Sequence, residues 1–216
     1  MIKIHHLNNS RSQRVLWFLE ELGCDYEILH YTRDLETNLA PDSLKEVHPL
    51  GKSPVLEDGD VKIAESGAIV EYLARTYGDG KFSLEPSDDD YYSYSEWMHY
   101  AEGSLMLPLL LRLYTSRLGD AAAPLGPRIQ SEIGNHLTYS AKGLGEKEFY
   151  AGGKLTGADI QMLFPLEALN ASGGLAHFPN LKAYVERMQA RPAYLRGLER
   201  GGDYAMGPQN QVPQDG

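Results

Sequence analysis

The spacing of apolar positions predicts alternating strands and helices in the first third of the chain. Apolar runs at residues 2–7 and 26–31 predict strands, and the apolar stripe between them predicts a helix over residues 11–23. Residues 55–57 and 61–63 flank an Asp-Gly turn and predict a β-hairpin. Because a βαβ unit needs parallel strands and a hairpin needs antiparallel ones, we expect a mixed sheet. Further helices at 42–47 and 65–77 complete the order β-α-β-α-β-β-α.

The remainder of the chain is predicted to be helical. Residues 79–87, with one glycine and one proline, indicate a linker after an α/β domain at residues 1–78. Residues 88–200 show helical periodicity and predict an all-α domain. Its first helix is expected to bend at Pro108, because proline lacks the backbone N–H that the helix needs. Residues 201–216 carry few apolar side chains and are predicted to form a flexible tail.

Helix boundaries in the second part follow from local signals. Thr156 and Asp159 have the spacing of a capping box, which predicts a helix that ends before Gly173. A loop is expected at residues 119–126 between two long helices. The last helices are expected at residues 179–190 and from Pro192 to residue 200.

Charge and composition exclude several classes of partner. The formal net charge is −10, and no cluster of Lys and Arg stands out, which argues against nucleic acid and anionic membranes. No apolar run approaches the length of a membrane span, and the first residues lack the pattern of a signal peptide, so we expect a cytoplasmic protein. Cys24 is the single cysteine, which excludes an internal disulfide.

The polar stretch between the first strand and the first helix is the main candidate for chemistry. Ser10 lies where the unpaired N–H groups and the positive end of the helix dipole can hold a thiolate or another small anion. The simpler interpretation is that Ser10 only caps the helix, since serine is a favoured cap residue. Asn9 and Ser12 are alternative hydrogen-bond donors in the same stretch.

Four motifs together resemble the cytosolic glutathione transferases. They follow one another in that family's order and spacing: Asn9-Ser10-x-x-x-Arg14-Val15, His48-Pro49-x-Gly51-Lys52-Ser53-Pro54-Val55-Leu56, Glu65-Ser66-x-Ala68-Ile69-x-x-Tyr72-Leu73 and Thr156-x-Ala158-Asp159. The sequence looks most like the bacterial and fungal members with a serine in the first loop. The resemblance implies a thioredoxin-like N-terminal domain, an all-helical C-terminal domain, a homodimer, and glutathione as co-substrate.

The resemblance also implies roles for particular residues. Ser10, or in its place Asn9, would favour the thiolate form of glutathione, which is the nucleophile. A cis peptide bond before Pro54 would let the backbone of Ser53 pair with the tripeptide as an added strand does. Charged and polar groups would hold the ends of glutathione: Lys52 the glycyl carboxylate, Ser66 the γ-glutamyl carboxylate and Glu65 the ammonium group. The implied reaction is attack on a small hydrophobic electrophile.

Residues of the first long helix are candidates for contacts with the electrophile, namely Tyr100, Glu102, Ser104 and Leu107. A metal site is not expected, although His99, Glu96 and Glu102 share one helical face. A Ser-His-Asp hydrolase is not expected either, because His5 and His6 point to opposite faces of their strand and no acid is placed beside Ser10. The alternatives left open are a glutathione-dependent peroxidase or isomerase, and a non-catalytic binding protein of the same fold.

Overall fold

The computed structural model describes residues 1–210, and their contacts divide into two compact units. The first unit holds Met1–Ser83 together with the residues from Glu186 onward. The second unit holds Leu84–Val185. The predicted domain limits at residues 78, 88 and 200 remain predictions, and the contacts add that the last helix belongs with the N-terminal residues.

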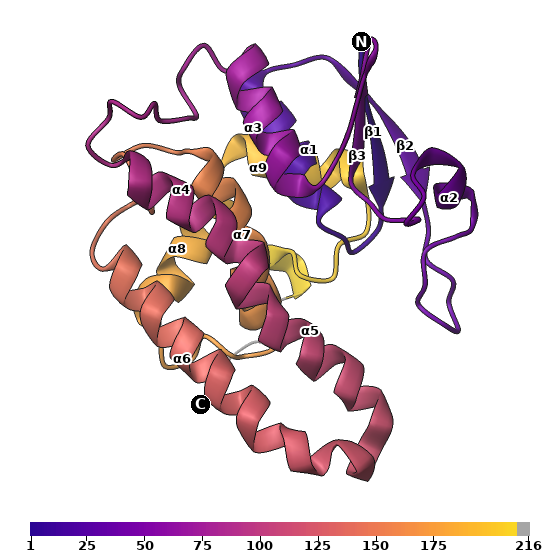
Figure 1. Ribbon diagram of the computed structural model, residues 1–216, viewed down its shortest axis with the longest axis vertical. Coiled ribbons are helices and arrows are strands. Elements are labelled where there is room, and N and C mark those ends of the chain that lie inside the picture. Colours follow the sequence, from indigo (N-terminus) through magenta and orange to yellow (C-terminus); the bar gives the residue numbers. More distant parts are fainter. Residues whose placement is uncertain (211–216) are drawn as a thin grey trace. The chain divides into compact units, whose positions relative to one another are not determined.

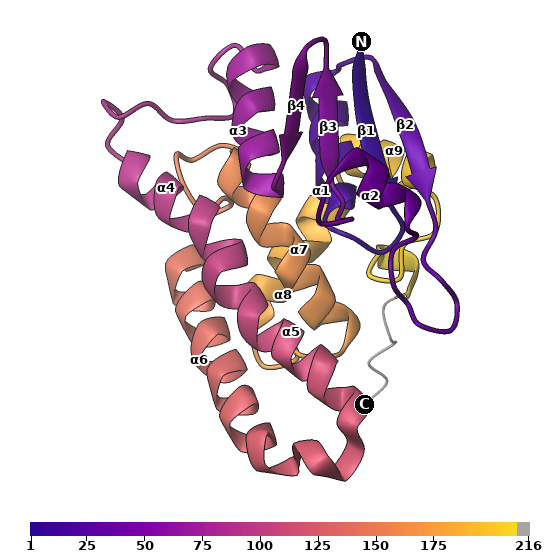
Figure 2. The same cartoon turned by 45° about the vertical axis from the view of Figure 1, so that its right-hand side comes forward.

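The first unit is built on the predicted mixed sheet. Its elements are, in chain order, β1 (Ile2–Leu7), α1 (Ser12–Leu22), β2 (Tyr26–Tyr31), α2 (Ser43–Val47), β3 (Val55–Asp58), β4 (Val61–Ala64) and α3 (Ser66–Tyr77). The strand order is β2-β1-β3-β4, with β1 parallel to β2 and the other pairs antiparallel. Helices α1 and α3 lie on one side of the strands, and α2 lies on the other (Figures 1 and 2). The predicted fold class is therefore confirmed.

Alternation along β1 explains how the sheet builds a core. Ile2 and Ile4 are buried, and Ile4 pairs with Ile28 on β2 and with Leu56 on β3. Because side chains alternate between the two faces of a strand, His6 shares the face of these isoleucines. The pattern places a buried histidine at the carboxyl end of β1, beside the start of α1.

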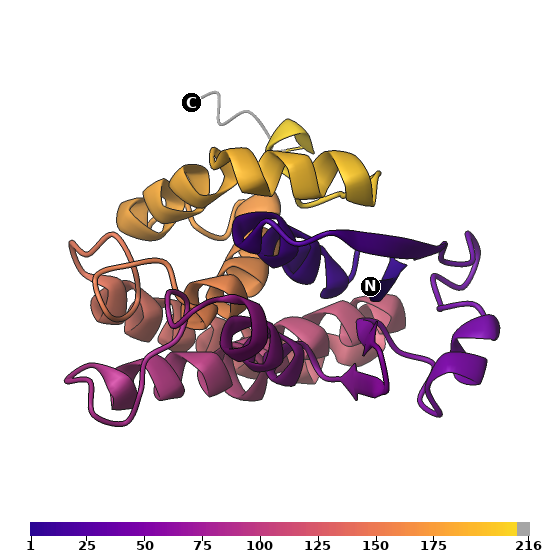
Figure 3. The same cartoon turned by 90° about the horizontal axis from the view of Figure 1, so that it is seen from above.

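Helix α9 (Pro192–Gly201) packs tightly against α1, and the two helices lie side by side in Figure 3. Glycines make this approach possible. A Cβ atom on Gly197 would lie 2.9 Å from the backbone nitrogen of Trp17, and a Cβ atom on Gly201 would lie 2.6 Å from Oε1 of Gln13. The spacing of four residues puts Gly197 and Gly201 on one face of α9. The backbone of α9 therefore rests directly on α1.

Ion pairs flank the contact between α1 and α9. Arg191 binds Glu21 through two nitrogens, at 2.6 and 3.0 Å. Arg196 and Arg200 both bind Glu20, at 2.8 and 2.9 Å. Partly exposed pairs contribute little singly, about 0–1 kcal/mol each, but a shared network loses less side-chain entropy per contact. These pairs fix the rotation of α9 about its own axis, while the glycines fix its distance from α1.

The chain after α9 remains packed on the first unit as far as the structure describes it. Tyr204 is only 2% exposed, and the carbonyl of Met206 accepts a hydrogen bond from Nε2 of Gln189 at 3.2 Å. A short 3₁₀ helix follows at Pro208–Asn210. Residues 211–216 of the predicted flexible tail lie outside the described residues.

The second unit is helical, as predicted. Its elements are α4 (Tyr91–Tyr100), the π-helical turn η1 (Ala101–Leu105), α5 (Met106–Thr115), the 3₁₀ segment η2 (Ser116–Leu125), α6 (Gly126–Leu144), α7 (Gly157–Ala171) and the first part of α8 (Pro179–Gln189). Segment η2 occupies most of the loop expected at 119–126, with an interruption at Gly119. The capping box of Thr156 and Asp159 at the start of α7 is confirmed.

The bend expected at Pro108 takes the form of a π-helical turn one turn earlier. The ring of Pro108 would clash with the carbonyl of Ser104 in a regular α-helix. The helix instead widens, and the N–H of Met106 bonds the carbonyl of Ala101, five residues back. The sequence signal for a distortion was correct, but the distortion precedes the proline because the blocked carbonyl lies four residues before it.

Replacing Gly197 with alanine tests the close contact of α9 and α1. We expect Gly197→Ala to lower the free energy of unfolding by about 1–3 kcal/mol, because the added methyl group meets the backbone of α1 and neither helix can yield locally. The measurement is equilibrium unfolding in urea. Gly134→Ala is the matched control: Gly134 is inside α6 with no atom within 4 Å of its added Cβ, so alanine should raise stability by up to about 1 kcal/mol. Equal stability of both variants would refute the close contact.

Candidate functional site

Ser10 lies between the end of β1 and the start of α1, as predicted, and is only 6% exposed. Its Oγ accepts a hydrogen bond from the backbone N–H of Ser12 at 3.2 Å, which satisfies one of the unpaired donors at the start of α1. The same Oγ lies 2.7 Å from Oγ of Ser12. Ser10 therefore caps one backbone N–H at the start of α1, and its hydroxyl is hydrogen-bonded to that of Ser12.

The contact between the two serines continues to a buried histidine. Oγ of Ser12 lies 2.8 Å from Nδ1 of His6, and Nε2 of His6 lies 3.1 Å from the carbonyl oxygen of Gly201. A carbonyl only accepts, so Nε2 of a neutral His6 carries the proton and Nδ1 accepts from Ser12. The carbonyl oxygen of Leu7, at 3.3 Å, is a second and more distant acceptor for Ser12, and with either acceptor Ser12 accepts from the hydroxyl of Ser10. The donors thus run from Ser10 through Ser12 to His6.

Burial keeps His6 neutral. Its side chain is 2% exposed, and burial, with a smaller contribution from the neighbouring His30, lowers the pKa of His6 to about 4. The hydrogen bond to the carbonyl of Gly201 opposes this shift without overcoming it. At neutral pH the direction of the hydrogen-bond chain is consequently fixed by the single proton of the imidazole.

Asn9 is held in the left-handed region, with φ of 51°. Its side-chain Oδ1 accepts a hydrogen bond from the backbone N–H of Ala205 at 2.7 Å. Arg33 holds the other side of the loop, because its Nη2 binds the carbonyl of Asn9 at 3.3 Å and its Nε binds the carbonyl of Asn8 at 3.1 Å. Arg33, in the segment after β2, therefore holds the backbone of this loop, and Ala205, in the segment after α9, holds the side chain of Asn9.

The second predicted motif adjoins the first. The peptide bond between Ser53 and Pro54 is cis, which confirms that prediction. Oγ of Ser53 accepts the N–H of Leu7 at 3.1 Å and donates to the carbonyl of His5 at 2.8 Å. It also lies 3.5 Å from Oγ of Ser10. The cis-proline loop is thus tied to the end of β1, directly beside the first loop.

The third predicted motif is distinguished by its backbone. Glu65, the residue before α3, has φ of 72°, which is unusual for a residue with a side chain and typical of functional sites. The buried Ser66 follows at the first position of α3, and Nη1 of the buried Arg14 approaches its Oγ at 3.5 Å. A helix start, a hydroxyl and a guanidinium together favour an anion. Lys52 is exposed to solvent.

The residues predicted to contact the electrophile belong to the second unit. Tyr100 ends α4 and its hydroxyl lies 2.7 Å from Nδ1 of His136 on α6, while burial raises its pKa. Glu102 and Ser104 lie in the π-helical turn η1, a feature often found at functional sites. Leu107 on α5 is 56% exposed. Their roles remain predictions.

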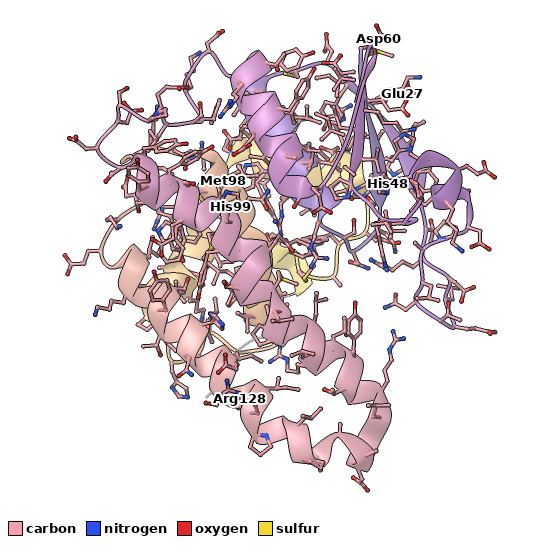
Figure 4. All side chains as sticks on the ribbon, viewed as in Figure 1. Glu27, His48, Asp60, Met98, His99 and Arg128 are labelled. Atoms are coloured by element: carbon pink, nitrogen blue, oxygen red, sulfur yellow. The ribbon has the colours of Figure 1, made fainter. Side chains whose placement is uncertain are left out.

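No metal centre is evident in the part of the chain that the structure describes. Within residues 1–210, no three or more His, Cys, Asp or Glu side chains form a group suited to hold a metal ion. Met98 is buried in α4 and the adjacent His99 is exposed on its surface (Figure 4). Over the same residues, none of the helices combines the length and hydrophobicity needed to cross a membrane.

Sequence reasoning missed two parts of the site. His6 enters the sequence-based predictions only as a rejected hydrolase base, because His5 and His6 point to opposite faces and no acid is placed beside Ser10, whereas the structure buries it on the face of β1 that carries Ile2 and Ile4. The second missed part is the segment from Gly201 to Ala205, which was predicted to be flexible. The pair Gly197 and Gly201, four residues apart in a helix, was the signal that α9 packs closely against another element.

Comparisons with known proteins agree with this architecture. The family model described as glutathione S-transferase, N-terminal domain matches residues 1–75, and the one described as glutathione S-transferase, C-terminal domain matches residues 120–192. Glutathione S-transferase 3 of Schizosaccharomyces pombe is 36% identical over 218 residues, covering 93% of this chain and 88% of that protein. Glutathione S-transferase 1 of Saccharomyces cerevisiae is 33% identical, with coverage of 93% and 95%.

Solved structures give the same result. A glutathione S-transferase from Actinobacillus pleuropneumoniae has a TM-score of 0.83 and 36% identity, and the match covers 93% of each chain. A glutathione transferase homolog from Lodderomyces elongisporus, solved with two GSH per subunit, has a TM-score of 0.79 at 22% identity, with coverage of 92% of this chain and 98% of that one, a likeness of fold. The fold is that of a transferase with a thioredoxin-like N-terminal domain. The chain belongs to the glutathione S-transferase family and is an enzyme of that class.

The neutral state of His6 predicts a dependence of stability on pH. The pKa of His6 is about 4 in the folded protein and about 6.5 when unfolded, so between these values the unfolded chain binds more protons. Stability from this residue is therefore present above pH 6.5 and falls as the pH drops toward 4.

The measurement compares urea unfolding of the wild type and His6→Gln at several pH values from 4.5 to 7.5, values chosen to span the window in which His6 titrates. Glutamine retains a donor for the carbonyl of Gly201 but does not titrate. The stability difference in favour of the wild type should shrink on acidification, by at most about 1.4 kcal/mol per pH unit. Parallel curves for the two proteins would show that His6 does not carry this proton linkage.

Proposed function

We propose that this protein conjugates glutathione to small hydrophobic electrophiles, with the first loop holding the sulfur as a thiolate. The observation that carries the proposal is that the first motif contacts both the second and the third. Ser10 lies 3.5 Å from Ser53 of the cis-proline loop, and Arg14 of α1 approaches Ser66 at the start of α3. Crystallisation of the Lodderomyces elongisporus relative with GSH supports the choice of ligand.

Each end of glutathione has a matching group in this arrangement. The γ-glutamyl carboxylate would bind at the start of α3, where Ser66 and the charge of Arg14 add to the helix dipole. Its ammonium group would bind Glu65, and the glycyl carboxylate would bind Lys52. The backbone of Ser53 would pair with the cysteinyl residue as an added strand does. The sulfur would then come to the first loop, at Asn9 and Ser10.

The proposed reaction needs no further co-reactant. A thiolate attacks the electrophilic carbon, a carbon–sulfur bond forms, and the leaving group departs with the electron pair of its bond. With a chlorinated nitroaromatic substrate the leaving group is chloride. Formation of a homodimer, a cytoplasmic location, and contacts of Tyr100, Glu102, Ser104 and Leu107 with the electrophile belong to the same proposal.

The test is a conjugation assay combined with glutathione binding. We expect the purified protein to bind glutathione, measured by calorimetry, and to accelerate its conjugation to a chlorinated nitroaromatic with release of chloride. Tight binding without turnover would instead favour a non-catalytic member of the family. Reduction of a hydroperoxide in the absence of conjugation would favour the peroxidase.

Glu65→Gln tests the placement of the ammonium group. Because glutamine keeps the shape but removes the charge, we expect the dissociation constant for glutathione to rise about tenfold, corresponding to about 1.4 kcal/mol, with unchanged thermal stability. Glu27→Gln is a suitable control, since Glu27 is near the start of β2, and β2 and β4, the strand before Glu65, are the two edge strands of the sheet. An affinity equal to the wild type in Glu65→Gln would remove Glu65 from the binding site.

A further inference from the structure

We propose that the side-chain amide of Asn9, and not the hydroxyl of Ser10, donates the hydrogen bond that holds the glutathione thiolate, and that the segment from Gly201 to Ala205 sets this division of roles. The inference rests on the proposed function and deepens it. Asn9 is then the catalytic residue, and Ser10, Ser12 and His6 are positioning residues.

The first step concerns the only proton that Ser10 can donate. Because Nε2 of His6 donates to the carbonyl of Gly201, Nδ1 accepts the proton of Ser12. The short contact of 2.7 Å between Ser10 and Ser12 then requires Ser10 as the donor. The alternative acceptor for Ser10, Oγ of Ser53, is farther away at 3.5 Å. The hydroxyl proton of Ser10 thus points into the protein, and toward a bound sulfur it offers only a lone pair.

The second step concerns the amide of Asn9. A backbone N–H can only donate, so the side-chain atom that faces Ala205 at 2.7 Å is the oxygen of the amide. The amino group of Asn9 therefore points away from Ala205, and within residues 1–210 it has no hydrogen-bond partner. Asn9 is not fully buried. It supplies two N–H donors in the loop that the sulfur would reach.

The third step concerns the origin of this arrangement. Two backbone groups of one short segment determine the arrangement. The carbonyl of Gly201 selects the tautomer of His6, and the N–H of Ala205 orients the amide of Asn9. Gly201 in turn is held because α9 rests on α1. The end of the chain therefore acts on the chemistry of the first loop without contributing a side chain to it.

The proton of the thiol leaves to solvent in this scheme. The S–H bond breaks, the electron pair stays on sulfur, and water takes the proton. The hydroxyl groups of Ser10 and Ser12 lead toward Nδ1 of His6, but His6 does not keep the proton, because its side chain is buried and burial disfavours its charged form. The resulting thiolate accepts hydrogen bonds from the amino group of Asn9 at the positive end of α1.

The experiment measures the pKa of bound glutathione from the ultraviolet absorbance of its thiolate, together with the dissociation constant and the conjugation rate. Asn9→Asp keeps the acceptor for Ala205 and removes the donor. We expect it to raise the pKa of the bound thiol by at least about one unit. At pH values below the pKa of the wild-type bound thiol, the conjugation rate should then fall about tenfold. Asn9→Ala should shift the pKa in the same direction without adding charge.

Matched variants separate the effect of losing the Asn9 donor from the effects of added charge and of altered loop structure. Asn8→Asp adds the same charge to the neighbouring residue, whose Oδ1 also accepts a backbone N–H, and should move the pKa much less. Ser10→Ala should lower the conjugation rate, because it disturbs the structure of the first loop, while the pKa of the bound thiol stays depressed. Ser12→Ala releases the proton of Ser10, so in the Asn9→Ala background it should restore part of the lost acidity, which a purely structural role cannot do.

The outcomes are distinct. A pKa that rises to that of free glutathione in Ser10→Ala but not in either Asn9 variant would overturn the inference and assign the sulfur to Ser10. A bound thiol whose pKa is the same in all variants would also overturn it, leaving only backbone N–H groups and the helix dipole. A wild-type protein that does not bind glutathione would instead refute the proposed function. Circular dichroism of each variant verifies the fold.

Discussion

The structure of the first unit depends on the close contact of α9 with α1. At Gly197 the backbone of α9 rests on the backbone of Trp17, and at Gly201 it rests on the side chains of Gln13 and Leu16. The ion pairs of Glu20 and Glu21 then fix the orientation of α9 about its own axis. A contact between backbones tolerates little displacement, because interiors are close-packed and a shift of a few tenths of an ångström already costs contacts. It can therefore position a single carbonyl group.

That carbonyl group determines how protons are arranged in the first loop. A neutral imidazole has one N–H, and the group that takes it decides what the other nitrogen does. Here Gly201 takes it, so His6 becomes an acceptor for Ser12 and the chain of hydroxyl groups points inward. Burial depresses the pKa of His6 and removes the doubly protonated state that could reverse the chain. In the proposed mechanism, the buried His6 thus decides which neighbouring residue can donate to the sulfur.

Local signals predicted most of the elements, and long-range packing accounts for what they missed. The strands, the hairpin, the capping box of Thr156 and Asp159, and the cis bond before Pro54 were correctly anticipated, because each depends on a few adjacent residues or on a family motif. The assignment of α9 to the first unit depends on two glycines and on arginines that meet Glu20 and Glu21 some 170 residues away in sequence. The position of the π-helical turn depends on a carbonyl that Pro108 blocks, which a residue-by-residue pattern does not show.

The candidate site likewise has a part that could be predicted from the sequence and a part that depends on packing. Residue type and position singled out Ser10, whereas Ser53, Glu65 and Ser66 were named through the resemblance to a family, and the structure brings Ser10 and Ser53 together. Spacing could not decide between Asn9 and Ser10, because both are short polar residues at a helix start and either can cap or donate. The difference lies in what their other atoms already bind. Asparagine at position 9 also tolerates the left-handed backbone that this loop adopts, at lower cost than most residues. One side chain therefore meets three demands at once: it fits the turn, it accepts the backbone N–H of Ala205, and it keeps an amino group for an anion.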